Sequence, residues 1–415
     1  MNSHRSVASI RMLVPLLTAA GILLAGNGLQ GTLIAVRGAE EGFPAALIGL
    51  MGTAYFLGFI CGCMMVPHLL RSVGHIRTFS ALAAVAASAT LLLVMVIDVW
   101  AWLLLRLLLG FCFSGLFTTV ESWINAGVSN HDRARVLSLY RLIDLAAVTG
   151  SQFLLPLFGT SGFVLFGLIA IMTAMSLVPV SLADRSNPTP PAAFSFDLRP
   201  LWRLSPVACV GCVSIGLTNS SFRLVGPLYA QEIGLSLTSV ATFMSAGIVG
   251  GAVLQYPLGW LSDRTDRRIA LLVATVGACL AGGYLSWFAG ADEWRNYAGI
   301  FTFGAFALPL YSLSAAHAND HATDGDYVMV AAGLTFFFSI GAMAGPVVAA
   351  LLIRYAGPQA LFSYTSVVHL TLVFYTLWRM RARAAVPAEM RKRFVSLLRT
   401  SPVFIKMAGR KNNSK

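Results

Sequence analysis

The chain has 415 residues, of which 57% are hydrophobic and 11% are charged. In a soluble chain of this size roughly a quarter of all residues would be charged, so the composition argues against a soluble protein. The formal net charge of +12 does not indicate nucleic-acid binding, because most of the basic residues fall in short segments between apolar runs and in the C-terminal tail.

Apolar runs of about 20 residues recur along the chain, and each can cross a hydrocarbon core of ~30 Å as a helix that rises ~1.5 Å per residue. The alternation of apolar and polar residues that is typical of a transmembrane barrel does not occur. We therefore expect an all-α integral membrane protein. Its twelve predicted transmembrane helices are residues 12–35, 45–70, 76–97, 101–127, 135–158, 162–182, 206–230, 237–261, 269–290, 296–318, 327–354 and 358–379.

A proline-rich polar segment divides these spans into two groups of six, because prolines and small polar residues do not continue a helix. The predicted domains are an N-terminal six-helix bundle (1–182), a cytoplasmic linker (183–205), a C-terminal six-helix bundle (206–379) and a basic cytoplasmic tail (380–415). The groups are also similar in sequence. A shift of 192 residues aligns Asn27 with Asn219 and Gly58 with Gly250, and a shift of 194 aligns Gly110 with Gly304. This repeat predicts two pseudo-symmetric bundles with a substrate site between them.

The distribution of arginine and lysine predicts the orientation in the membrane. With the N-terminus inside, the cytoplasmic segments and the tail hold nearly all of the 29 basic residues, and the opposite side holds Arg37, Arg295 and Arg354. Basic residues in short loops stay on the cytoplasmic side, so both termini are expected there.

The turn between the eighth and ninth spans reads Gly-Trp-Leu-Ser-Asp-Arg-Thr-Asp-Arg-Arg over residues 259–268. It resembles the G-x-L-x-D-R-x-G-R-R/K signature of major facilitator superfamily (MFS) transporters, with Asp266 in place of the internal glycine. The equivalent turn of the first half has Arg71 where the family has its acid. Either Arg71 pairs with Asp263 across the pseudo-twofold axis, or this copy of the repeat is degenerate. The resemblance implies a cytoplasmic gate formed by Arg71, Asp263, Arg264, Arg267 and Arg268.

Two further stretches support the resemblance. Arg106-x-x-x-Gly110 is similar to an intramembrane arginine motif of the family, and the Glu-Ser-Trp sequence that begins at Glu121 resembles the poorly characterised YcaD-like bacterial branch. The family implies a multi-pass protein of the bacterial inner membrane that moves a small solute by alternating access, as a symporter or antiporter.

Candidate substrate contacts are the polar residues in spans that would line a cavity between the halves. A charged group inside a span is costly and is therefore a functional candidate. The predicted contacts are Asn27, Gln30, Arg106, Arg141, Asn219, Arg223 and Gln255. The amides could instead fasten helices together. Arg223 needs an anion beside it, which is either a carboxylate side chain or an anionic substrate.

Coupling to protons needs a group that changes its protonation inside the cavity, and the candidates are Glu121 and Asp144. Each has a structural alternative. Asp144 lies three residues after Arg141, so the two could form an ion pair on one helix face. Glu121 could brace the cytoplasmic turns instead.

Two other classes of function are compatible with a helical membrane protein. A membrane-embedded enzyme would need metal ligands or a nucleophile with a base, but the histidines are scattered and Cys209-x-x-Cys212 has no second pair. We expect no enzymatic activity, no metal site and no cofactor. The remaining alternative is a non-transporting membrane sensor or assembly partner on the same scaffold. The expected partners are a small-molecule substrate, protons and the lipid bilayer, with no nucleic acid, and the protein is expected to be a monomer.

Overall fold

The polypeptide is built from long apolar helices, and the computed structural model describes residues 2–127, 133–182, 198–322 and 327–384, with residues 386, 387, 391 and 394. Within this part of the chain there is no strand, and twelve segments are long and apolar enough to cross a membrane. Large apolar side chains such as Leu104, Leu280 and Phe374 are exposed on the outer surface, as lipid contact requires. The predicted all-α membrane architecture is confirmed.

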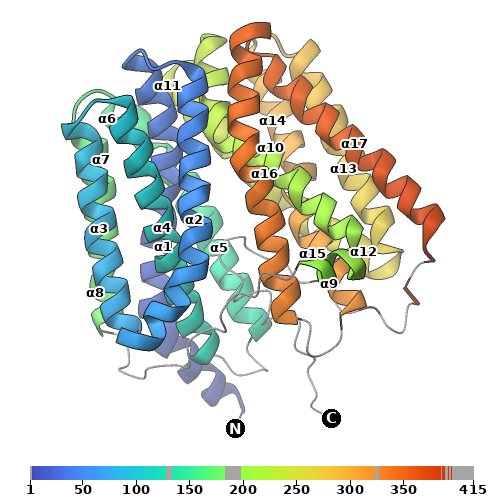
Figure 1. Ribbon diagram of the computed structural model, residues 1–415, viewed down its shortest axis with the longest axis horizontal. Helices are drawn as coiled ribbons and strands as arrows, with labels where there is room; N and C mark the ends of the chain where they lie inside the picture. The colour runs from blue at the N-terminus through green and yellow to red at the C-terminus, as the bar shows by residue number, and fades with distance from the viewer. Residues whose placement is uncertain are drawn as a thin grey trace.

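The helices fall into two groups, which Figure 1 shows as two bundles side by side. The first group comprises α1 (Asn2–Glu40), α2 (Ala45–Val73), α3 (His75–Met95), α4 (Val99–Gly127), α5 (Arg133–Gln152), α6 (Leu154–Phe158), α7 (Val164–Met175) and α8 (Leu177–Leu182). The second comprises α9 (Arg199–Leu204), α10 (Pro206–Glu232), α11 (Leu237–Val253), α12 (Gln255–Arg264), α13 (Arg267–Trp287), α14 (Glu293–Ala307), α15 (Leu310–His321), α16 (Tyr327–Ala356) and α17 (Ala360–Ala382).

Four predicted spans consist of two helical segments each, namely α5–α6, α7–α8, α11–α12 and α14–α15. A proline lies at each break: Pro156, Pro179 and Pro257 are within the second segment, and Pro309 directly precedes α15. Proline lacks an N–H group and its ring clashes with the carbonyl four residues earlier. In the first three cases the preceding segment ends four residues before the proline, where that carbonyl loses its hydrogen bond.

Equivalent glycines bring equivalent helices into contact in the two halves. A Cβ atom on Gly110 of α4 would lie 1.9 Å from the Tyr55 carbonyl oxygen of α2, and one on Gly304 of α14 would lie 1.9 Å from the Gly247 carbonyl oxygen of α11. Small residues let membrane helices approach this closely. The predicted repeat is therefore visible as the same backbone-to-backbone crossing in each bundle.

The two bundles contact each other mainly through α2 with α16, α1 with α10, and α5 and α6 with α11. The Gly49 Cα of α2 faces the Pro346 carbonyl of α16, and Thr53 donates a hydrogen bond to the Met343 carbonyl. These residues lie toward the start of α2, at the end of the molecule away from the turn at residues 265–266. In Figure 1 the bundles approach each other at that upper end and diverge toward the end where α1 begins.

The predicted connector between the halves is partly helical. Residues 183–197 lie outside the described residues, but Arg199–Leu204 form α9. The polar composition predicted no helix before residue 206. Pro200 is nevertheless compatible with α9, because it lies in the first turn, where a backbone N–H group has no hydrogen-bond acceptor within the helix. Most of the predicted basic tail also lies outside the described residues.

Candidate functional site

A central cavity lies between the two halves, near the middle of the helices that line it. Its volume is about 160 Å³. The lining comes from α1, α2, α4 and α5 of the first half and from α10, α11 and α16 of the second. The polar side chains that line it include Asn27, Tyr55, Arg106, Arg141, Asp144, Gln152, Asn219 and Arg223.

Five of the seven predicted substrate contacts line this cavity: Asn27, Arg106, Arg141, Asn219 and Arg223. The other two do not. Gln30 is fully buried, where its amide donates to Thr90 and its carbonyl oxygen accepts from Arg106, so it joins α1, α3 and α4. Gln255 is buried at the start of α12.

Arg106 is held against an aromatic ring at the cavity wall. Its guanidinium lies 4.5 Å from the centroid of the Tyr55 ring and donates to the Gln30 side chain at 3.1 Å. The Tyr55 hydroxyl donates to the Asn27 side chain at 2.8 Å. The Nε atom of Arg106 is buried and has no hydrogen-bond partner among the described residues. Arg106 is therefore held in position, and its Nε–H group is available to donate a further hydrogen bond.

Arg141 and Asp144 form an ion pair at 2.8 Å on one face of α5. This is the structural alternative that the sequence spacing allowed. Arg223 of α10 faces the same cavity, and it has no hydrogen bond or ion pair with the described residues. Among the described residues, three guanidinium groups and one carboxylate line the cavity, which gives a net charge of +2 when all four are ionised.

The two proton-coupling candidates lie in different surroundings. Asp144 lines the cavity, whereas Glu121 of α4 is fully buried outside it and accepts a hydrogen bond from the Tyr140 hydroxyl of α5 at 3.1 Å.

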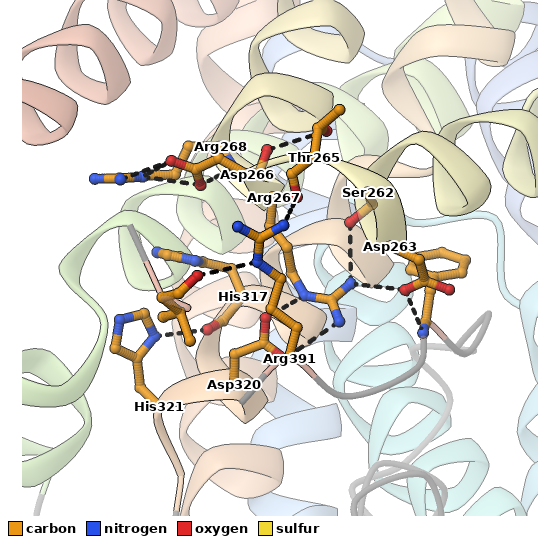
Figure 2. Close-up of polar contacts among 12 residues, drawn as sticks. Ser262, Asp263, Thr265, Asp266, Arg267, Arg268, His317, Asp320, His321 and Arg391 are labelled. Carbon is orange, nitrogen blue, oxygen red and sulfur yellow. Dashed lines mark hydrogen bonds and ion pairs between the residues drawn. The ribbon is translucent and has the colours of Figure 1, made fainter. Parts of the chain in front are cut away.

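Three of the five predicted gate residues, Asp263, Arg267 and Arg268, take part in the polar contacts around the α12–α13 turn that Figure 2 shows. Arg267 forms a bidentate ion pair with Asp320 at the end of α15 and also donates to Asp263 at 3.3 Å. Arg268 pairs with Asp266 at 2.7 Å, and the Arg264 guanidinium lies over the Trp260 ring. The fifth residue, Arg71, is exposed on the last turn of α2.

Asp266, which replaces the glycine of the family signature, is the N-cap of α13. Its carboxylate accepts from the Arg268 amide at 3.0 Å and from the Arg268 guanidinium. Burial opposes ionisation of this carboxyl, but the hydrogen bonds from Arg268 outweigh that effect and lower the pKa of Asp266 below its ordinary value. The substitution therefore ends the turn with a charged helix cap.

Sequence reasoning missed Tyr55 and Asp320 as site residues. Asp320 lies two residues beyond the predicted tenth span, whereas α15 continues to His321 and buries it. The sequence did contain a signal for Asp320, because an acid at the edge of a span can pair with one of the three arginines in a turn on the same side of the membrane. His317 is also buried, and its ring lies beside that of His321.

Comparison with known proteins decides the family. A model of the Major Facilitator Superfamily matches residues 16–324. The chain is a member of the Major Facilitator Superfamily. It is 24% identical over 360 residues to an uncharacterised MFS-type transporter of Yersinia pestis, covering 84% of this chain and 91% of that protein. It is 22% identical over 345 residues to the MFS-type transporter YcaD of Salmonella newport, covering 82% and 88%.

Solved MFS structures share the fold. The nucleoside transporter NupG matches with a TM-score of 0.75 and 12% identity over 90% of this chain and all of that one. An inward-facing bacterial homologue of the lysosomal transporter Spinster matches with a TM-score of 0.67 and 13% identity over 98% and 99%. The protein is thus a multi-pass membrane transporter, and the predicted relation to the YcaD-like branch is confirmed.

Proposed function

We propose that this MFS transporter carries a small amphipathic organic anion across the bacterial inner membrane, coupled to protons and by alternating access. The observation that carries the proposal is the charge of the central cavity, where Arg106, Arg141 and Arg223 face one carboxylate, Asp144. Arginines at this depth are costly unless they are paired. An anionic substrate would supply the negative charge that balances these arginines.

The rest of the lining supports an amphipathic solute. The aromatic rings of Tyr55, Phe56, Phe59, Phe117 and Phe338 surround the same cavity. Ligand sites commonly combine apolar and aromatic walls with a few placed polar groups. A carboxylate would bind the guanidinium groups, and the apolar body of the solute would contact the rings.

The Arg141–Asp144 ion pair supports coupling to protons. While Asp144 is ionised, it competes with a substrate anion for Arg141, which is 2.8 Å away. Protonation of Asp144 neutralises the carboxylate and frees the Arg141 guanidinium for the substrate. The proton and the anion would then bind together, which is the requirement for symport. Glu121 stays the second candidate for the proton site.

The proposal is tested by flux in proteoliposomes. We would measure uptake of radiolabelled 4-hydroxybenzoate and related monocarboxylates, with the corresponding amides as uncharged controls, under an inward proton gradient. We expect gradient-driven accumulation of one or more of the acids and none of its amide. In Asp144→Asn, gradient-driven accumulation should be lost while counterflow exchange survives.

Arg223→Gln should weaken the apparent affinity for the transported acid by about tenfold or more, because a charge-assisted hydrogen bond is lost. Glu121→Gln is measured alongside, and unchanged accumulation would remove Glu121 from coupling. Equal transport of acid and amide would refute the anion assignment. Binding without flux would support the alternative of a membrane sensor.

A further inference from the structure

A second basic site lies outside the central cavity, at the end of the second half where α10 and α13 begin and α15 and α17 end. Five arginines line a small recess there, and we name it the arginine recess. The five are Arg267, Arg268, Arg379, Arg383 and Arg391. Val207 at this recess and Arg223 at the central cavity are sixteen residues apart along α10, or about 24 Å, so the two sites are separate.

Carboxylates balance only part of this charge. Asp320 pairs with Arg267 and Asp266 pairs with Arg268. No carboxylate of the described residues pairs with the other three arginines, so the described lining residues carry a net charge of +3 when the histidines are neutral.

The three arginines that pair with no carboxylate of the described residues have N–H donors that can bind a further acceptor. Arg383 donates to the Leu204 carbonyl oxygen at 2.8 Å, and Arg391 donates to the Thr265 carbonyl oxygen at 2.6 Å. The Nε atom of Arg379 is buried without a partner among the described residues. A guanidinium has five N–H donors, so each of these side chains can also bind an anion.

The start of α10 adds to the positive potential. Ser205 is its N-cap, Pro206 is its first residue, and both line the recess with Val207. The N-terminus of this 27-residue helix carries a partial positive charge and favours anions nearby.

We propose that the arginine recess binds a phosphate group, supplied either by a soluble phosphate compound or by a phospholipid headgroup. A phosphate offers several acceptor oxygens and up to two negative charges, which suits multiple guanidinium forks better than a single carboxylate or a halide does. Arg383 and Arg391 belong to the segment after α17, whose Phe394 amide donates to Asp263 at 2.8 Å. Because Arg391 donates to the Thr265 carbonyl oxygen, bound phosphate would also hold Arg391 against the α12–α13 turn.

The test uses the full-length protein, purified in detergent and stripped of lipid. Its thermal unfolding is followed while inorganic phosphate is added against sodium chloride of matched ionic strength. A parallel series reconstitutes the protein in phosphatidylcholine bilayers with and without phosphatidic acid. We expect saturable stabilisation in at least one series, because a ligand that binds the folded state raises its stability. Stabilisation by phosphate alone identifies a soluble source, and stabilisation by phosphatidic acid alone identifies a headgroup.

Variants locate the site. Arg383→Gln and Arg391→Gln should each weaken the apparent affinity by about tenfold or more. Arg354→Gln removes the same charge from an exposed position at the opposite end of the molecule and should leave the affinity unchanged. The proposal is refuted if neither ligand stabilises the unsubstituted protein beyond the chloride control, a comparison that needs no variant. It is also refuted if Arg223→Gln abolishes the effect while Arg383→Gln and Arg391→Gln retain it, because the anion would then occupy the central cavity.

Discussion

Buried arginines in this transporter occur in two settings that have opposite consequences for stability and function. Arg267 is compensated by Asp320, and their side chains are 2% and 1% exposed. Arg223 has no such partner among the described residues. Removing one member of a buried pair leaves an uncompensated charge, whereas an arginine that faces a solvent-filled cavity depends on its ligand. We therefore expect substitutions at the first pair to affect stability and substitutions at Arg223 to affect binding.

Asp320→Asn tests the structural pair. It removes the carboxylate charge, keeps the size of the side chain and leaves Arg267 buried, so we expect a loss of about 3–5 kcal/mol in the free energy of unfolding. The measurement is denaturant-induced unfolding of the protein in detergent micelles. Asp292→Asn is the matched control, because Asp292 is an exposed N-cap that asparagine fills equally well. Equal stability of the two variants would contradict the role of the pair.

Helix crossings at the scale of whole elements depend on glycines rather than on side-chain contacts. A Cβ atom on Gly110 or Gly304 would overlap a backbone carbonyl of the partner helix, and a backbone moves less readily than the end of a side chain. The cost of overpacking is typically 1–3 kcal/mol. Because Tyr55 is the residue that Gly110 contacts, displacement of α2 would also move a wall of the central cavity.

Gly110→Ala and Gly304→Ala are therefore expected to destabilise the protein by about 1–3 kcal/mol each. Gly283→Ala in α13 has open space around the new methyl group, and it should be neutral or stabilising by up to about 1 kcal/mol because alanine favours the helix. Unfolding in detergent compares the three. If all three variants were equally stable, close backbone contact at these crossings would be excluded.

Hydropathy predicts where the helices are but not where they break. Pro257 ends α11, whereas Pro67 lies inside α2 without ending it, so a proline alone does not decide the outcome. The difference depends on how neighbouring helices pack, which one sequence does not specify. The end of α15 shows the same limit, because packing against the arginine turn buries Asp320 beyond the apolar run.

The candidate site was predictable to the extent that intramembrane charge marks it. Arg106, Arg141, Asp144 and Arg223 stand out because charge in a span is costly, and all four line the central cavity. Whether an uncharged side chain faces the cavity or a neighbouring helix was not predictable from the sequence. Gln30 fastens helices, and Tyr55, which sequence alone does not separate from other aromatic residues, lies under Arg106.

Closure at one end is a property of the whole molecule, and it gives the last prediction. A Cβ atom on Gly49 would lie 2.6 Å from the Pro346 carbonyl oxygen, so Gly49→Leu obstructs the contact between α2 and α16. Under the proposed alternating access, a penalty of about 1–3 kcal/mol on the closed form would shift the ratio of closed to open molecules about 5- to 150-fold. Spin labels at the exposed residues Phe163 and Trp294, in a background without the native cysteines, should then report a longer distance. Gly283→Leu controls for added bulk, and an unchanged distance distribution in Gly49→Leu would show that this contact does not hold the halves together.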